Sequence, residues 1–86
     1  YGWTSYAGTI GTGYFEGCTF GAGAGYNFSR PYAPTTYVNC NFEAGHKIDA
    51  RAKVSFENCT LDGVALTSAN INDLVTGNRQ NIESVK

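Results

Sequence analysis

The sequence has few charged residues, only two prolines, no methionine and no long apolar run. Charged residues make up 15% of its 86 residues, against about 25% in typical soluble domains, and the net charge is −1. A chain without a basic excess has no general attraction for nucleic acid or for an anionic membrane. The longest aliphatic run is Val64–Leu66, so we expect no membrane span.

Cysteine is also scarce, and its spacing does not indicate disulfide bonds. There are three cysteines, an odd number, at Cys18, Cys40 and Cys59. The first two are 22 residues apart and the last two are 19 residues apart. They form no Cys-x-x-Cys pair, and the sequence holds a single histidine, so we expect no metal site and no cofactor. That histidine, His46, follows a glycine at an expected turn, and we interpret it as a surface residue without a role.

Glycine and aromatic residues are abundant instead, with 11 glycines, six tyrosines, five phenylalanines and one tryptophan. Together with few helix-forming residues, this composition predicts an all-β fold. The cysteines also mark an internal repeat, because Tyr14–Gly21, Thr36–Glu43 and Ser55–Asp62 align column by column. Three copies with a period of about 20 residues are typical of a solenoid, in which each copy forms one coil. A flat β-sandwich is the alternative fold, and the repeat disfavours it.

Each column of the repeat has a physical interpretation. Aromatic side chains and cysteines are expected to face the interior and to stack from coil to coil. Glycine and asparagine accept the left-handed backbone most readily, so their column predicts a sharp corner between two short strands. The predicted structural ladder consists of the corner residues Gly17, Asn39 and Asn58 and the cysteines Cys18, Cys40 and Cys59.

Two further segments carry clear patterns. Apolar and polar residues alternate over Ile48–Phe56, which predicts half-buried strand with at most one gentle bend. Thr67–Gly77 combines an N-cap candidate, helical apolar spacing and a terminal glycine, which predicts a helix of about two turns that caps the solenoid. We expect a last strand over residues 81–86.

The segments FENCTL, YVNCNF and YFEGCTF resemble the repeats of right-handed parallel β-helix proteins. That superfamily includes bacterial surface proteins and adhesins, phage tailspikes and fibres, and pectate-lyase-like enzymes. The resemblance implies a single right-handed β-solenoid domain over residues 1–86, with about three coils over about 9–63 and a cap over about 64–86. It also implies an extracellular, cell-surface or virion location, and we expect the chain to be the C-terminal part of a longer protein.

Carboxylates are the candidate catalytic groups. Glu43 and Asp62 occupy equivalent positions on successive coils, so their backbones are expected to lie about 5 Å apart. Two carboxylates at about that separation suit a retaining glycosidase. The alternative is a pair of acids on a solvated face beside turns. The resemblance to lyases transfers no specific residue to this sequence.

Aromatic residues outside the repeat are the candidate binding groups. They lie in glycine- and proline-rich segments, where flat amphipathic rings can stack on sugars or pack at a protein interface. The alternative is that they fill irregular coils. The candidate binding residues are Trp3, Tyr6, Tyr26 and Tyr32.

We therefore interpret the chain as a non-catalytic structural or binding module of an extracellular surface or fibre protein. The expected partners are a surface glycan or a host-surface protein, with further coils or a neighbouring subunit at the N-terminal end. One alternative is a fragment of a polysaccharide-degrading lyase or glycoside hydrolase that uses Glu43 and Asp62. The other is a self-assembling fibre or trimerisation module.

Overall fold

A computed structural model describes residues 3–4, 13–21, 28–77 and 79–86 of the chain. These residues form short β-strands and two 3-10 turns, and none of them lies in an α-helix. The all-β prediction is therefore confirmed. The same residues include no helix long and apolar enough to cross a membrane.

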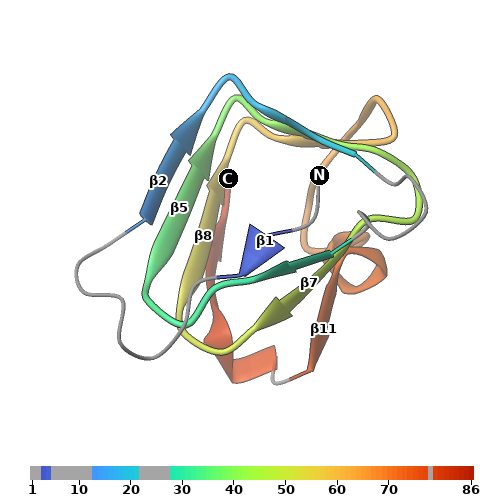
Figure 1. Ribbon diagram of the computed structural model, residues 1–86. Coiled ribbons are helices and arrows are strands. Elements are labelled where there is room, and N and C mark those ends of the chain that lie inside the picture. The colour runs from blue at the N-terminus through green and yellow to red at the C-terminus, as the bar shows by residue number, and fades with distance from the viewer. Residues whose placement is uncertain (1–2, 5–12, 22–27, 78) are drawn as a thin grey trace.

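The strands form three sheets that surround one interior (Figure 1). The first sheet is parallel and contains β2 (Gly13–Glu16), β5 (Thr35–Val38), β8 (Val54–Glu57) and β12 (Ile82–Val85). The second sheet contains three parallel strands and one antiparallel strand, namely β3 (Thr19–Phe20), β6 (Asn41–Phe42), β9 (Thr60–Leu61) and the antiparallel β10 (Val64–Ala65). The third sheet is parallel and contains β1 (Trp3–Thr4), β4 (Phe28–Arg30), β7 (Lys47–Ala50) and β11 (Val75–Gly77).

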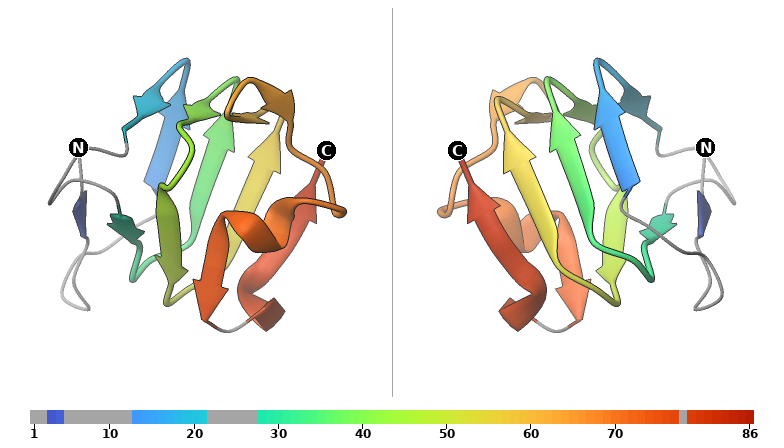
Figure 2. Two further views of the ribbon diagram at one scale, coloured as in Figure 1. Left: turned by 90° about the vertical axis from the view of Figure 1, so that its right-hand side faces the viewer. Right: turned by 90° about the vertical axis from the view of Figure 1, so that its left-hand side faces the viewer.

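The chain visits the three sheets in turn, and each return to the first sheet places a new strand beside the previous one (Figure 2). One such passage through the three sheets is called a coil below. Phe15 lies opposite Tyr37 in this pairing, and Tyr37 lies opposite Phe56. The register is the one that the repeat predicts, although the first two copies are 22 residues apart and the next two are 19 apart. The difference in length is accommodated outside the paired columns.

Aromatic rings fill the interior in stacks that run across the coils. The ring centroids of Phe15 and Tyr37 are 5.5 Å apart with planes 15° apart, and those of Tyr37 and Phe56 are 5.1 Å apart at 8°. Phe20 and Phe42 form a second stack with centroids 5.0 Å apart. Because the two stacks meet edge to face, both offset and T-shaped contacts stabilise the core.

The corner column has the backbone conformation that the sequence predicts. The φ angles of Gly17, Asn39 and Asn58 are 71°, 53° and 53°. The side-chain amide of Asn58 donates a hydrogen bond of 2.6 Å to the side-chain oxygen of Asn39 on the coil before it. Asparagine suits this corner for two reasons. It tolerates the left-handed backbone region, and its side chain can hydrogen-bond to the next asparagine along the stack.

The cysteines face inward beside this corner. Cys40 and Cys59 are buried, Cys18 is half-buried, and all three are free thiols. The thiol of Cys59 donates to the carbonyl oxygen of Tyr37 at 3.3 Å, and that of Cys40 donates to Val38 at 3.3 Å. Each sulfur therefore packs as a small apolar group and also satisfies a carbonyl at the end of a strand.

The alternating segment Ile48–Phe56 is strand on both sides of a short bend, as predicted. β7 ends at Ala50 and β8 begins at Val54, and the inward-facing residues of both strands are buried. The predicted last strand is also present as β12.

The predicted helix over Thr67–Gly77 is wrong. This segment contains a single 3-10 turn, Ile71–Asp73, and then β11, which joins the third sheet beside β7. The side chain of Asn70 accepts a hydrogen bond from the backbone N–H of Thr67 and donates one to the carbonyl of Ala65. Such side-chain bonds to the backbone compete with helical hydrogen bonds, and parallel pairing with β7 fixes the residues that follow.

A hairpin precedes this segment and ends the second sheet. Asp62 and Gly63 have φ angles of 54° and 77°, which reverse the chain and lay β10 antiparallel on β9. Two consecutive left-handed residues are what a tight two-residue hairpin requires. The regular coil pattern therefore stops at Gly63, as the sequence indicates.

Candidate functional site

The two predicted catalytic acids occupy matching positions on successive coils. The backbone N–H of Glu43 donates to Phe20 at 3.0 Å, and that of Asp62 donates to Phe42 at 2.7 Å. Both side chains are exposed. The surroundings differ, because Asp62 begins the β9–β10 hairpin with a left-handed backbone. A catalytic role for this pair stays a prediction.

Asp62 also lines an open groove of 460 Å³ beside the hairpin. Leu61 and Val64 contribute apolar side chains to its lining, and Lys47 and Asp73 contribute charged ones. The ammonium group of Lys47 donates to the backbone carbonyl of Asp73 at 2.7 Å, which ties the end of the 3-10 turn to β7. The lining of the groove therefore combines apolar side chains with charges of both signs.

The structure describes one side chain of the four predicted binding aromatics. Tyr32 is half-buried at the bend between β4 and β5, and the guanidinium carbon of Arg51 lies 5.8 Å from its ring centroid. Tyr6 and Tyr26 lie outside the described residues, and Trp3 is described only through its backbone in β1. The predicted grouping of these aromatics stays a prediction.

Beside Tyr32 lies a charged cluster that the sequence analysis missed. Asp49 accepts hydrogen bonds from Nε of Arg30 at 3.0 Å and from Nε and Nη2 of Arg51 at 3.2 and 3.1 Å. The hydrogen bonds from Arg51, and to a smaller extent the one from Arg30, hold the pKa of the Asp49 carboxyl below its usual range. One carboxylate thus aligns two guanidinium groups from neighbouring coils.

The sequence holds only part of the signal for this cluster. Asp49 and Arg51 are two residues apart on the polar side of an alternating segment, so a contact between them is foreseeable. Arg30 joins them because β4 pairs with β7, with Ser29 opposite Ile48. That register is a property of the folded coils.

His46 is buried, and its interpretation as a surface residue is wrong. Its ring has no exposed surface, and Nδ1 lies 2.7 Å from the carbonyl oxygen of Gly21 while Nε2 lies 2.7 Å from the hydroxyl of Ser29. Because a carbonyl only accepts, Nδ1 carries the proton and Nε2 accepts from Ser29. Burial lowers the pKa of His46, and the hydrogen bond to Gly21 opposes this shift in part.

A serine hydroxyl bonded to a neutral imidazole is an arrangement that activates nucleophiles in enzymes. Here Ser29 and His46 are both fully buried, and the rings of Phe20 and Phe42 lie 5.7 and 5.8 Å from the imidazole. The pair therefore acts as a polar link between two coils within an apolar interior. Gly45, whose φ is 95°, turns the chain inward just before His46, so the glycine that suggested an exposed turn precedes a buried side chain.

Comparisons of the chain with protein-family models, curated proteins and solved structures give no match. Within the ranges that the structure describes, no three His, Cys, Asp or Glu residues are grouped in a way that could hold a metal ion.

Proposed function

We propose that the chain forms a short right-handed parallel β-helix and serves as a non-catalytic structural and binding module of an extracellular surface or fibre protein. The observation that carries this proposal is the continuity of the side-chain ladders from coil to coil. Phe15, Tyr37 and Phe56 stack in register, and the amides of Asn39 and Asn58 bond along the same direction. Repeated contacts of this kind make a stiff element that presents the same face on each coil.

The course of the chain supports the right-handed winding. In Figure 1 the chain runs up β5, crosses the second sheet, returns along β7 and starts up β8, which is a clockwise circuit. Figure 2 shows that successive strands of the first sheet advance from the N-terminal side to the C-terminal side. Since the N-terminal coil faces the viewer in Figure 1, a clockwise circuit recedes, as in a right-handed helix. Parallel crossovers in sheets are nearly always right-handed.

We further propose that the hairpin replaces the expected helix as the cap of the second sheet. β10 pairs antiparallel with β9 and so occupies the edge to which a further parallel strand would add. Ile71, Leu74 and Val75 are buried against the core in the segment that follows. Blocked edges and atypical terminal repeats are the usual means by which solenoids end.

The exposure of the acids supports the non-catalytic part of the proposal. A working acid pair needs one carboxyl that stays protonated near neutral pH, through burial or through a second carboxylate held close to it. Glu43 and Asp62 are both exposed, and only Asp62 lines the groove. A sugar polymer also needs several subsites in a cleft before a bond is held for cleavage.

The proposal is tested by incubating the chain with a panel of acidic and neutral polysaccharides. We expect no new reducing ends and no unsaturated products. The matched control combines Glu43→Gln with Asp62→Asn, and we expect it to fold and to bind like the parent chain. Turnover that disappears in this double variant would contradict the proposal and favour the enzyme.

A further inference from the structure

The open groove beside the β9–β10 hairpin has the size of a small-molecule site. Its volume is 460 Å³, and such sites commonly occupy about 300–1,000 Å³. The hairpin contributes Leu61, Asp62 and Val64 to its lining, and the segment with the 3-10 turn contributes Asn70 and Asp73. The function proposed above gives this groove no role.

The carboxylates of Asp62 and Asp73 are the groove's uncommitted polar groups. Both residues are exposed, and neither carboxylate accepts a hydrogen bond or forms an ion pair within the parts of the chain that the structure describes. The ammonium group of Lys47 donates to the backbone carbonyl of Asp73 and pairs with neither carboxylate. Two carboxylates and one ammonium group leave the lining with an excess of one negative charge.

We propose that this groove binds a primary aliphatic amine in its ammonium form. Such a ligand carries one positive charge at neutral pH, as a lysine side chain does, and so matches the excess charge of the lining. Its N–H groups donate to the carboxylates of Asp62 and Asp73. Its hydrocarbon chain packs on Leu61 and on Val64, whose side chain is a large apolar group left 61% exposed. This proposal does not rest on the function proposed above.

The backbones that carry the two acids are fixed before a ligand arrives. Asp62 begins the hairpin with a φ of 54°, and the side-chain oxygen of Asn41 anchors this hairpin by accepting a hydrogen bond from the hydroxyl of Thr60. The hydrogen bond of 2.7 Å from Lys47 to the carbonyl of Asp73 holds the end of the 3-10 turn against β7. Binding therefore orders two short side chains and no loop, which limits the entropy lost.

The groove suits a small organic cation better than a metal ion. A divalent cation needs several oxygen ligands, and the described ranges contain no group of three His, Cys, Asp or Glu residues that could hold one. The apolar side chains of Leu61 and Val64 would also contribute nothing to a bare ion.

The groove also suits a small amine better than an extended peptide. A peptide would add to the outer edge of β10 through main-chain hydrogen bonds. Leu66 donates to Cys59 across the β9–β10 pair, so the polar groups of Ala65, one residue earlier, point to that outer edge. The carbonyl of Ala65 already accepts a hydrogen bond from the side chain of Asn70. The edge is therefore closed to a further strand at this point.

The test is an NMR titration of the 86-residue chain with hexylamine at neutral pH. We expect saturable shifts of the methyl groups of Leu61 and Val64, and an affinity that falls as salt is added. Hexanol has the same chain without the charge, and it should bind at least about threefold more weakly, the effect of one exposed ion pair. Calcium chloride at matched ionic strength should not displace the amine.

Three variants separate the contributions of charge and apolar surface. Asp62→Asn and Asp73→Asn should each lower the affinity for hexylamine about threefold and leave that for hexanol unchanged. Asparagine tolerates the left-handed backbone at position 62, so the hairpin should be retained. Val64→Thr keeps a β-branched residue in β10 and should weaken both ligands.

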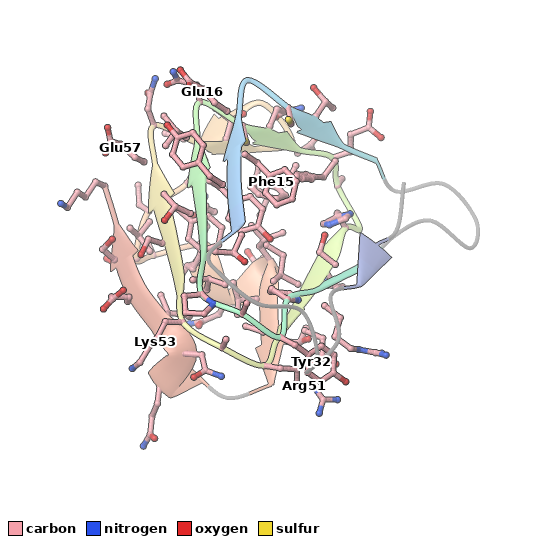
Figure 3. All side chains as sticks on the ribbon, turned by 60° about the vertical axis from the view of Figure 1, so that its left-hand side comes forward. Phe15, Glu16, Tyr32, Arg51, Lys53 and Glu57 are labelled. Atoms are coloured by element: carbon pink, nitrogen blue, oxygen red, sulfur yellow. The ribbon has the colours of Figure 1, made fainter. Side chains whose placement is uncertain are left out.

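Glu57→Gln is the matched control, because it removes an exposed carboxylate from the outer side of the first sheet (Figure 3). All of β9 lies between this residue and Asp62, and we expect unchanged affinity. Equal binding of hexylamine and hexanol, no saturable shift, displacement by calcium, or equal effects of Glu57→Gln and both asparagine variants would each overturn the site. The polysaccharide panel tests the proposed function separately, so the two proposals can fail independently.

Discussion

Asn58 and Asn39 share a φ angle of 53° and are joined by a 2.6 Å hydrogen bond between their side chains. Their backbone N–H groups also bond from coil to coil, Asn39 to the carbonyl of Glu57 and Asn58 to that of Lys86. The corner therefore combines a strained backbone conformation with hydrogen bonds that run along the stack. Its stability depends on residues that tolerate the conformation as well as on those bonds.

Asn58→Val should lower the free energy of unfolding by about 1–3 kcal/mol, because a β-branched residue at positive φ is strained and the bond to Asn39 is lost. Asn58→Gly keeps the conformation and should cost much less. Both are measured by denaturant unfolding. Equal losses from the two variants would contradict the role of the backbone at this corner.

Cys40 should resist bulky thiol reagents in the folded chain and react only on unfolding. It is buried between coils, and burial raises the pKa of its thiol, so little reactive thiolate forms. Cys18 is half-buried and serves as the internal comparison, with faster labelling expected. Mass spectrometry of labelled peptides gives both rates. Labelling of Cys40 as fast as Cys18 would show that the first two coils separate readily.

Stability should fall as the pH drops below about 6.5, through the titration of His46. Burial lowers the pKa of His46 in the folded state, so the unfolded chain binds the proton first. The stability that neutral His46 contributes is fully present above the pKa of His46 in the unfolded chain. It is lost as the pH falls toward the pKa of His46 in the folded chain. Chemical unfolding across this range should show the loss in the parent chain.

His46→Gln removes the titrating group while it keeps hydrogen-bonding capacity toward Gly21 and Ser29. This variant should be less stable than the parent at neutral pH, with a weaker dependence on pH between 7 and 5. If the stability of the variant depended on pH as strongly as that of the parent chain, the loss of stability at low pH would come from carboxylates elsewhere.

Tyr37→Phe should leave stability unchanged or raise it by up to about 1 kcal/mol. The Tyr37 hydroxyl is buried, and it has no hydrogen-bond partner among the residues that the structure describes. Phe15 and Phe56, its neighbours in the stack, already show that phenylalanine fits this column. Thermal and denaturant unfolding provide the measurement. A clear loss of stability would mean that the hydroxyl has a partner, and Tyr14→Phe at an exposed tyrosine serves as the surface control.

The sequence by itself determined the columns of the repeat and the alternating strands. Glycine and asparagine in one column indicate a local preference for the left-handed backbone. The alternation over Ile48–Phe56 indicates which side chains face inward. Both signals act within a few residues of the chain, so they can be recognised without knowledge of the fold. The end of the repeat pattern at Gly63 is also visible in the sequence, whereas the reversal that lays β10 on β9 is a finding of the structure.

The tertiary structure alone decided which residues meet across the coils outside the columns of the repeat. Arg30 meets Asp49, and His46 reaches Gly21 and Ser29, because successive coils are stacked in one register. Thr67–Gly77 has a helical pattern, yet β7 offers an open edge, and the hydrogen bonds gained by pairing β11 with it outweigh a weak local preference. Outside those columns, contacts between residues about 20 positions apart depend on the lengths of the intervening loops, and no local pattern encodes them.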